Sequence, residues 1–242
     1  MVHRLRKNRS RGVEEANDHF SGHLVTVASP DNVASEAYRT LRTNLLYALE
    51  DGPSKAIVVT SPGSMEGKSI TCANLGVVLA QADKNALILD CDLRKPALHK
   101  IFGLRNLRGL TDLLTGEGKL QEVWQESPVL GMKIVTAGPI PPYPAELLYS
   151  GRFAQLLDQA RQGFDYVLLD SPPTQLVSDP LILAAQGDGV LLVIDLQNTR
   201  RGSVRHSMRS LEAVGANLLG TVMNNVELPR GSYFDYRHAN TY

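Results

Sequence analysis

The amino-acid sequence predicts an α/β fold, in which a doubly wound and mostly parallel β-sheet is flanked by helices. Two observations support this fold class. Six short runs are rich in Val, Ile and Leu and almost continuously apolar, as is typical of strands buried on both faces of a sheet. Helical patterns separate most of these runs, and strands that alternate with helices form βαβ units around a parallel sheet.

The expected elements follow one another along the chain. The first is a helix over residues 32–49, with Asp31 or Asn32 as its N-cap. The six strands are expected at residues 56–60, 86–90, 133–137, 166–170, 190–195 and 219–224. Further helices are expected at residues 68–82, 145–162, 176–186 and 203–214, with two short ones at 110–115 and 120–125.

The chain of 242 residues is long enough for one large domain with its own core. Residues 1–12 carry five basic side chains and no acidic one, whereas the remainder has 20 basic and 25 acidic side chains. A basic segment of this kind could contact anionic lipid or an acidic partner, or simply be solvated. We expect a basic arm over residues 1–30, a domain over 31–227 and a flexible polar tail over 228–242.

Composition also excludes several classes of protein. The 25 Lys and Arg side chains balance 25 Asp and Glu side chains, so the basic excess of a nucleic-acid-binding protein is absent and no such partner is expected. Cys72 and Cys91 form no CxxC or Cys/His cluster, which argues against a zinc site or a disulfide framework. The most apolar stretch, residues 181–196, is interrupted by polar side chains and is shorter than the ~20 residues of a membrane span. We therefore expect a cytoplasmic protein.

Residues 56–69 combine a strand, a glycine-containing turn and the start of a helix. The turn ends in Gly67, Lys68 and Ser69, the order found in phosphate-binding P-loops. In such loops backbone N–H groups surround the phosphates, the Lys reaches the β- and γ-phosphates, and the Ser hydroxyl binds Mg²⁺. Pro62 stands where the strict pattern has its first Gly. The expected nucleotide contacts are Gly63, Ser64, Met65, Glu66, Gly67, Lys68, Ser69 and Ile70.

Three carboxylates follow two other expected strands. Asp90 and Asp92 lie at the end of the strand at 86–90, and Asp170 ends the strand at 166–170. Ligands of open parallel sheets bind beyond the carboxyl ends of the strands. A single Asp at such a place often only caps the next turn, but three beside a P-loop indicate a site for a magnesium nucleotide.

Over roughly residues 30–226 the sequence resembles the bacterial tyrosine kinases of the P-loop type, which regulate capsule and exopolysaccharide synthesis. The resemblance rests on residues 36–44, 60–69, 89–96, 169–173, 178–183 and 188–193. In such proteins the second, third and fourth of these stretches are the Walker A, Walker A′ and Walker B motifs. This chain departs from the family at Pro62, at Ser64 and Met65, where Pro-Gly is more usual, and in its sparse tail.

The resemblance implies an ATP-dependent protein-tyrosine kinase, with ATP and Mg²⁺ as cofactors, that phosphorylates mainly its own C-terminal tail. Lys68 would neutralise phosphate charge, while Ser69, Asp92 and Asp170 would hold Mg²⁺ directly or through water. Asp90 is the candidate to orient the tyrosine hydroxyl or accept its proton. The choice between Asp90 and Asp92 as the base stays open.

Three of the eight tyrosines, Tyr233, Tyr236 and Tyr242, lie within the last ten residues and are the expected autophosphorylation sites. The resemblance further suggests a membrane adaptor, namely a chain-length regulator of polysaccharide export. It also suggests a phosphotyrosine phosphatase as a partner and a location at the inner face of the cell membrane.

The helix at 32–49 carries Glu36, Arg39 and Arg42 on one stripe. By pattern alone this is a solvated face with an ion pair that contributes little to stability. The resemblance instead assigns these residues to a subunit interface in a ring oligomer.

The main alternative is a partition or site-selection ATPase, a nucleotide-driven dimer switch with the same fold and similar Asp motifs. Such proteins carry an extra signature Lys near the start of the loop, and residues 61–66 contain no Lys. They often end in a membrane-binding amphipathic helix, whereas this chain ends in polar, Tyr-rich sequence. Both differences favour the kinase.

Overall fold

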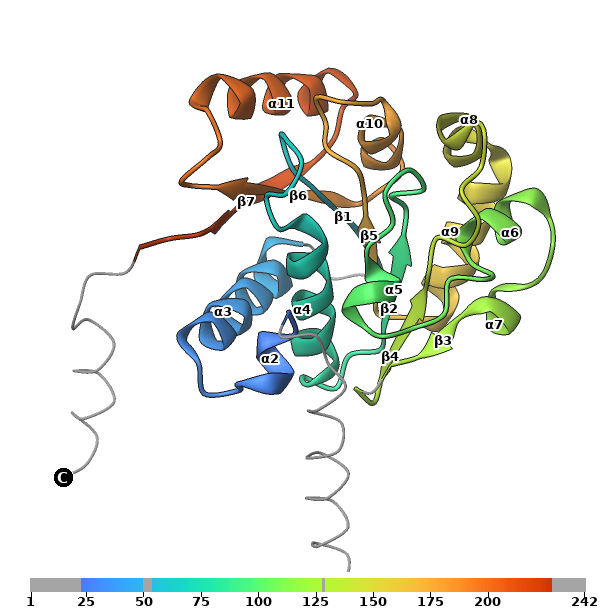
Figure 1. Ribbon diagram of the computed structural model, residues 1–242, viewed down its shortest axis with the longest axis horizontal. Helices are drawn as coiled ribbons and strands as arrows, with labels where there is room; N and C mark the ends of the chain where they lie inside the picture. Colours follow the sequence, from blue (N-terminus) through green and yellow to red (C-terminus); the bar gives the residue numbers. More distant parts are fainter. Residues whose placement is uncertain (1–22, 50–53, 128, 228–242) are drawn as a thin grey trace, which may run out of the picture.

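The computed structural model describes residues 23–49, 54–127 and 129–227 (Figure 1). Seven strands in this part of the chain form one sheet in the order β3-β4-β2-β5-β1-β6-β7. Neighbouring strands are parallel except β3 and β4, which are antiparallel. The strands are β1 (Lys55–Thr60), β2 (Ala86–Asp90), β3 (Gln125–Glu126), β4 (Met132–Val135), β5 (Tyr166–Asp170), β6 (Gly189–Asp195) and β7 (Leu218–Asn224).

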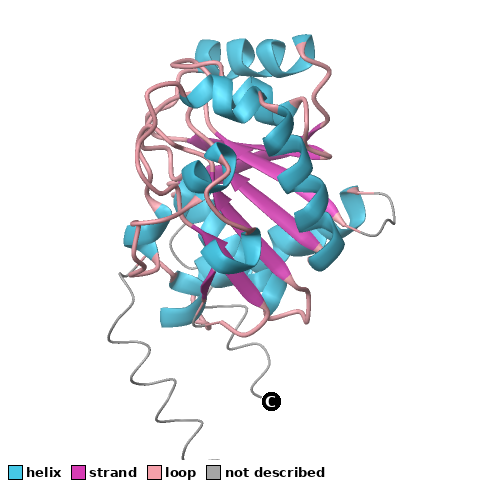
Figure 2. Ribbon diagram, turned by 90° about the vertical axis from the view of Figure 1, so that its right-hand side faces the viewer, coloured by secondary structure: helices cyan, strands magenta, loops and turns pink. Residues whose placement is uncertain are grey.

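Helices cover both faces of the sheet, so the expected doubly wound architecture is confirmed (Figures 1 and 2). One face packs against α2 (Val25–Ala28), α3 (Val33–Ala48), α4 (Lys68–Ala80) and α5 (Leu98–Ile101). The other face packs against α6 (Leu110–Thr115), α7 (Leu120–Val123), α8 (Pro144–Tyr149), α9 (Gly151–Gly163), α10 (Asp179–Ala184) and α11 (Arg201–Ala213).

The apolar runs are strands because both of their faces are buried. In β1, Val58 joins the hydrophobic cluster on one side of the sheet, whereas its neighbours Ile57 and Val59 join the cluster on the other side. Since successive side chains of a strand point to opposite faces, a strand covered on both faces has to be apolar at every position. The sequence of these strands therefore shows continuous apolar runs rather than alternating apolar and polar residues.

Two expected helices differ from the structure for local reasons. The segment at 145–162 forms two helices, α8 and α9, because Ser150 between them has extended backbone angles (φ −68°, ψ 152°). The helix expected at 176–186 begins only at Asp179. Pro180 explains the late start, since proline has no N–H to donate and fits only the first turn of a helix.

The expected arm does not extend to residue 30. Leu24 is fully buried and Thr26 is 1% exposed, and the short helix α2 between His23 and Ser29 packs on α3 and α4. Residues 1–22 lie outside the described residues. None of the helices in the described ranges has the length and apolar character needed to cross a bilayer.

Asn74 of α4 attaches this N-terminal segment to the domain. Its side-chain oxygen accepts hydrogen bonds from the backbone N–H (3.1 Å) and the hydroxyl (2.7 Å) of Thr26. Its amide nitrogen donates to the carbonyls of His23 (2.8 Å) and Ile70 (2.9 Å). Asn74 is fully buried, so no water can replace these partners.

We expect Asn74→Ala to lower the free energy of unfolding by about 1–3 kcal/mol, because it leaves the buried N–H and hydroxyl of Thr26 without acceptors. Urea denaturation followed by circular dichroism measures the change. Asn217→Ala is the matched control, since Asn217 is exposed and donates to one carbonyl, and it should change stability by less than about 0.5 kcal/mol. Equal effects of the two substitutions would contradict this role of Asn74.

Candidate active site

The turn between β1 and α4 has the backbone of a phosphate-binding loop. Gly67 directly precedes α4 and has a φ of 88°, a left-handed conformation that favours glycine. A Cβ atom at this position would also collide with the side-chain amide of Asn224 at the end of β7. Met65 has a φ of 65°, so a glycine would fit its place with less strain.

Hydrogen bonds within the loop and from β7 hold its shape. The N–H of Gly63 donates to Oε1 of Glu66 (3.0 Å), and the hydroxyl of Ser61 donates to the carbonyl of Gly63. Asn224 donates to the carbonyl of Glu66 (2.9 Å). Burial raises the pKa of Glu66, whose Oε2 atom has no hydrogen-bond partner in the described structure. The side chain of Glu66 therefore helps to hold the shape of the loop through its hydrogen bond with Gly63.

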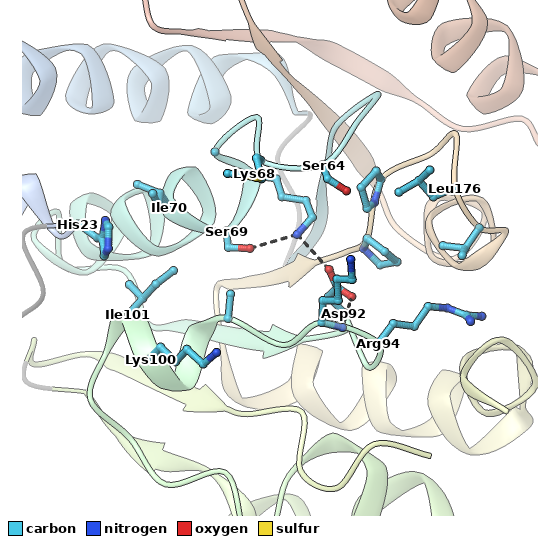
Figure 3. Close-up of a pocket in the computed structure, with 17 residues that line it drawn as sticks. His23, Ser64, Lys68, Ser69, Ile70, Asp92, Arg94, Lys100, Ile101 and Leu176 are labelled. Carbon is cyan, nitrogen blue, oxygen red and sulfur yellow. Dashed lines mark hydrogen bonds and ion pairs between the residues drawn. The ribbon is translucent and has the colours of Figure 1, made fainter. Parts of the chain in front are cut away.

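A cavity of about 870 Å³ opens over this loop (Figure 3). Six of the eight expected nucleotide contacts form its floor, whereas Gly63 and Glu66 do not line it. The loop after β2 contributes Asp92. Its walls come from α5 and from the segment after β5, and His23 lies at one end. The expected contacts that line the cavity are Ser64, Met65, Gly67, Lys68, Ser69 and Ile70.

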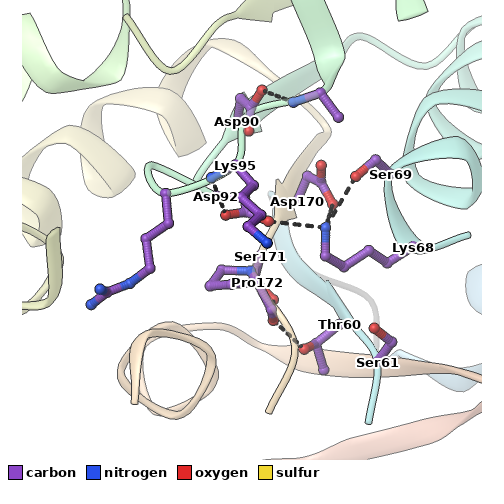
Figure 4. A network of polar contacts seen from close by, with 12 residues as sticks. Thr60, Ser61, Lys68, Ser69, Asp90, Asp92, Lys95, Asp170, Ser171 and Pro172 are labelled. Carbon is purple, nitrogen blue, oxygen red and sulfur yellow. Dashed lines mark hydrogen bonds and ion pairs between the residues drawn. The ribbon is translucent and has the colours of Figure 1, made fainter. Parts of the chain in front are cut away.

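The ammonium group of Lys68 is the positive centre of the site (Figure 4). Its Nζ atom lies 3.1 Å from Oδ2 of Asp92 and 4.0 Å from Oδ1 of Asp170, and it donates to the Ser69 hydroxyl over 3.2 Å. Burial alone would lower the pKa of Lys68, but the charges of Asp170 and Asp92 outweigh it and raise the pKa. Lys68 is therefore a permanent cation.

Asp170 provides an unusual pair of free acceptors. Both of its carboxylate oxygens are buried, and neither accepts a hydrogen bond among the described residues. Burial raises the pKa of Asp170, while the nearby charge of Lys68 opposes this effect. Buried carboxylate oxygens that accept no hydrogen bond are costly unless positive charge lies close to them, and Lys68 at 4.0 Å supplies only part of that charge. Ser69, Asp92 and Asp170 thus fit Mg²⁺, which takes few protein oxygens and completes its shell with phosphate and water.

Asp90 belongs to the same cluster but does not line the cavity. It is fully buried, and its Oδ2 atom accepts the N–H groups of Ala97 (3.2 Å) and Leu98 (3.1 Å) at the start of α5. Burial raises the pKa of Asp90, and the charge of Asp170 raises it further. The neighbouring Cys91 is fully buried in the core, as expected from the alternation of the strand.

Sequence analysis missed an ion pair that connects two walls of the cavity. Arg94 donates from Nε (2.8 Å) and Nη2 (3.0 Å) to the two oxygens of Asp179, a fully buried residue at the start of α10. Arg94 follows Asp92 in the loop after β2, and α10 follows the segment after β5. The pair joins residues 85 positions apart, so no local sequence pattern reveals it.

The other expected site residues lie away from the cavity or outside the described residues. Arg39 pairs with Glu36 (2.7 Å) and also donates to the carbonyl of Pro30. Arg42 donates to the carbonyl of Val78 in α4 (3.0 Å). Within one chain these residues of α3 therefore have internal partners. Tyr233, Tyr236 and Tyr242 fall outside the described residues.

Comparison with known proteins places this site in a family. Residues 57–235 match the family described as the CobQ/CobB/MinD/ParA nucleotide binding domain. The chain is 38% identical over 232 residues to the tyrosine-protein kinase YwqD of Bacillus subtilis. The aligned region covers 96% of this chain and 95% of YwqD. It is 32% identical over 213 residues to the tyrosine-protein kinase wzc of Salmonella typhi, covering 88% of this chain and 30% of wzc.

Solved structures agree with the sequence relatives. The chimerical protein CapA2B2 superposes with a TM-score of 0.82 at 35% identity, over 86% of this chain and 92% of that chain. The kinase domain of the Escherichia coli tyrosine kinase ETK has a TM-score of 0.80 at 32% identity, over 85% and 82% of the two chains. The septum site-determining protein MinD of Pyrococcus horikoshii, complexed with Mg-ADP, shares only the fold, at 20% identity and a TM-score of 0.62 over 73% and 74%.

We expect Asp179→Asn to weaken nucleotide binding by about tenfold, because Arg94 loses the charged half of its bidentate pair and the loop that carries Asp92 is less well held. Titration of a fluorescent ADP analogue with Mg²⁺ measures the affinity. Asp158→Asn removes an exposed acid from an i,i+3 pair on α9 and serves as the control. An unchanged affinity in Asp179→Asn would show that the pair does not position this loop.

Proposed function

The chain belongs to the bacterial tyrosine-protein kinases, and we propose that it transfers the γ-phosphoryl group of Mg·ATP to Tyr233, Tyr236 and Tyr242 of its own C-terminal segment. The observation that carries the proposal is the position of Lys68 at the floor of the cavity, between Asp92 and Asp170. This arrangement combines the charges that phosphoryl transfer requires, because that reaction depends mainly on positioning and charge neutralisation.

Each residue has a role that follows from its contacts. The backbone of the loop and the start of α4 would bind the phosphates, and the ammonium of Lys68 would offset their charge. Ser69 and Asp170 would hold Mg²⁺, with Asp92 binding it through a water so that its carboxylate can also face the tyrosine, and the bound ion would supply further charge neutralisation. In the transfer, a tyrosine oxygen bonds to the γ-phosphorus, the bond to the ADP oxygen breaks, and the phenolic proton passes to a nearby base.

The geometry favours Asp92 over Asp90 as the residue that orients the tyrosine hydroxyl or accepts its proton. Asp92 lines the cavity, where its oxygens accept the N–H of Lys95 (3.0 Å) and pair with Lys68, whereas Asp90 does not line it and accepts the N–H groups of Ala97 and Leu98. A general base has to come within hydrogen-bond distance of the proton that it removes. We therefore propose that Asp90 positions α5 and adds negative charge, and that Asp92 faces the substrates.

The acceptor segment would be supplied by a neighbouring molecule in a ring. Glu36, Arg39 and Arg42 lie on α3, and the family resemblance assigns this stripe to a subunit interface. Arg39 is one-third exposed and Glu36 is 57% exposed, so their pair is accessible to a second copy. Such head-to-tail contacts would close into a ring and let each tail reach the next active site.

We further propose that the kinase regulates capsule or exopolysaccharide synthesis at the inner face of the cell membrane. The matched domain makes up 30% of wzc, so that relative carries much additional sequence. We propose that a separate membrane adaptor, a chain-length regulator of polysaccharide export, supplies the corresponding part here, and that a phosphotyrosine phosphatase reverses the modification. No observation favours the switch ATPase, since MinD shares the fold alone and residues 61–66 lack the signature Lys.

We expect Lys68→Met to lower tail phosphorylation at least about 100-fold, because the loop loses the charge that stabilises the transferred phosphoryl group. An anti-phosphotyrosine blot after incubation with ATP and Mg²⁺ measures this. Lys119→Met is the control, because Lys119 is exposed and lies away from the cavity. Thermal melting shows whether the variant folds. Full phosphorylation by a folded Lys68→Met protein would refute the proposed function.

The two carboxylates after β2 should differ in their effects. Asp92→Asn should reduce phosphorylation at least about 100-fold, because it removes charge at the cavity wall. Asp90→Asn should reduce it about tenfold, since an amide oxygen can still accept the N–H groups at the start of α5. Initial rates at saturating ATP give the comparison. The opposite order would return Asp90 to the role of base.

A further inference from the structure

Helix α11 carries an exposed cluster of arginines that the proposed reaction does not use. Arg200 precedes the helix, and Arg201, Arg205 and Arg209 follow at intervals of four residues, which places the last three on one face. All four are exposed. Glu212 is the only acidic residue of the helix. We call Arg201, Arg205 and Arg209, together with the flanking Arg200, the α11 arginine face.

The charge of this face is not balanced within the described structure. No ion pair or hydrogen bond involves these four guanidinium groups among the described residues. Three arginines elsewhere in the described structure do have carboxylate partners, namely Arg39 with Glu36, Arg94 with Asp179 and Arg161 with Asp188. A row of unpaired guanidinium groups is suited to a ligand with several phosphates, because each group offers a planar fork of N–H donors.

Helix α11 packs on the segment that forms one wall of the active-site cavity. The hydroxyl of Thr174 donates to that of Ser207 in α11 (2.7 Å), and the side chain of Gln175 donates to the carbonyl of Ser203 (2.8 Å). Thr174 and Gln175 belong to the segment whose neighbours, including Leu176, line the cavity. Ser203 and Ser207 lie on the inward side of α11, so Arg201, Arg205 and Arg209 lie on its outward side, on a helix that itself borders the cavity wall.

The C-terminal segment has the length and the chemistry to occupy this face. It continues from β7, which contacts α11, and 18 residues follow Asn224. Extended, they would reach about 60 Å, whereas α11 is about 20 Å long. Phosphorylation of its three tyrosines would add roughly −4.5 to −6 charges at pH 7. Tyr233 and Tyr236 would lie about 10 Å apart in an extended chain, close to the ~12 Å from Arg201 to Arg209.

We propose that the α11 arginine face is a docking site for the phosphorylated C-terminal segment, in the same chain or in a neighbouring copy. The proposal rests on the proposed function, since it requires tail tyrosines that carry phosphate. Docking would hold the product tail on the outward side of α11 and so keep it out of the active site. The chemistry recognised is that of a phosphotyrosine peptide.

A membrane surface suits α11 less well. Helices that lie in a bilayer surface present large apolar side chains beside their basic ones. The apolar side of α11 is already used by the domain, since Leu211 is fully buried and Val204 packs against the core. Met208, at 40% exposed, is the only large apolar side chain of the helix among its exposed residues.

A synthetic peptide of residues 228–242 with phosphate on Tyr233, Tyr236 and Tyr242 tests the proposal by fluorescence anisotropy. The partner is the full chain with these three tyrosines changed to Phe, in the presence of Mg·ADP. We expect Arg201→Ala/Arg205→Ala/Arg209→Ala to weaken binding at least about tenfold, because three charge-assisted contacts are lost. The unphosphorylated peptide should bind at least about tenfold more weakly than the phosphopeptide.

The matched control is Arg105→Ala/Arg108→Ala/Lys119→Ala, which removes the same charge from exposed side chains elsewhere and should change affinity less than about twofold. Glu212→Gln should instead strengthen binding. Phosphopeptide affinity that is equal in the α11 variant and its parent would overturn the proposal. So would an α11 variant that loses only its binding to anionic lipid vesicles. Because the peptide arrives phosphorylated, failure of the kinase itself would appear separately, as an absent phosphotyrosine signal with ATP.

Discussion

The Nζ atom of Lys68 offsets the carboxylates that the sheet brings to one point. Asp90 and Asp170 are paired in register on neighbouring strands, and Asp92 lies two residues beyond β2. Parallel strands end at the same edge of the sheet, so these carboxylates lie close together and repel one another. Burial raises the pKa values of Asp90 and Asp170 even though the charge of Lys68 opposes this, because the protein interior disfavours their charged forms. The site is therefore built to receive further positive charge along with an anionic phosphate.

The loops around this charge depend on one another for their positions. Asn224 from β7 holds the carbonyl of Glu66, and the hydroxyl of Thr60 donates to the carbonyl of Pro172 (2.9 Å). Arg94 and Asp179 connect the loop after β2 with α10. Each contact joins the end of one strand, or the loop after it, to a segment that follows another strand. Preorganisation of this kind places charges before the substrate arrives, which is the main source of rate enhancement in phosphoryl transfer.

Much of the fold could be predicted because burial leaves a direct trace in the sequence. The central parallel strands are almost continuously apolar up to the residues at their ends, and α6 occupies residues 110–115 as expected. The spacing of apolar residues did not predict helix boundaries that depend on local backbone geometry. Ser150 divides the helix expected at 145–162, and Pro180 delays the start of α10. The helix α2 was missed because a single turn has no recognisable period, and its burial depends on Asn74, which is distant in the chain.

The sequence by itself determined the chemistry of this protein: a P-loop ending in Lys68 and Ser69, and carboxylates at the ends of two strands. These groups occur in short contiguous motifs, so their order along the chain is enough to recognise them. Only the tertiary structure decided which carboxylate faces the cavity and which is enclosed, because Asp90 and Asp92 differ in burial partners and not in residue type. It also decided the Arg94–Asp179 pair and the position of α11 beside the cavity wall. Contacts between segments far apart in the chain form only when the sheet brings those segments together, and no local pattern records them.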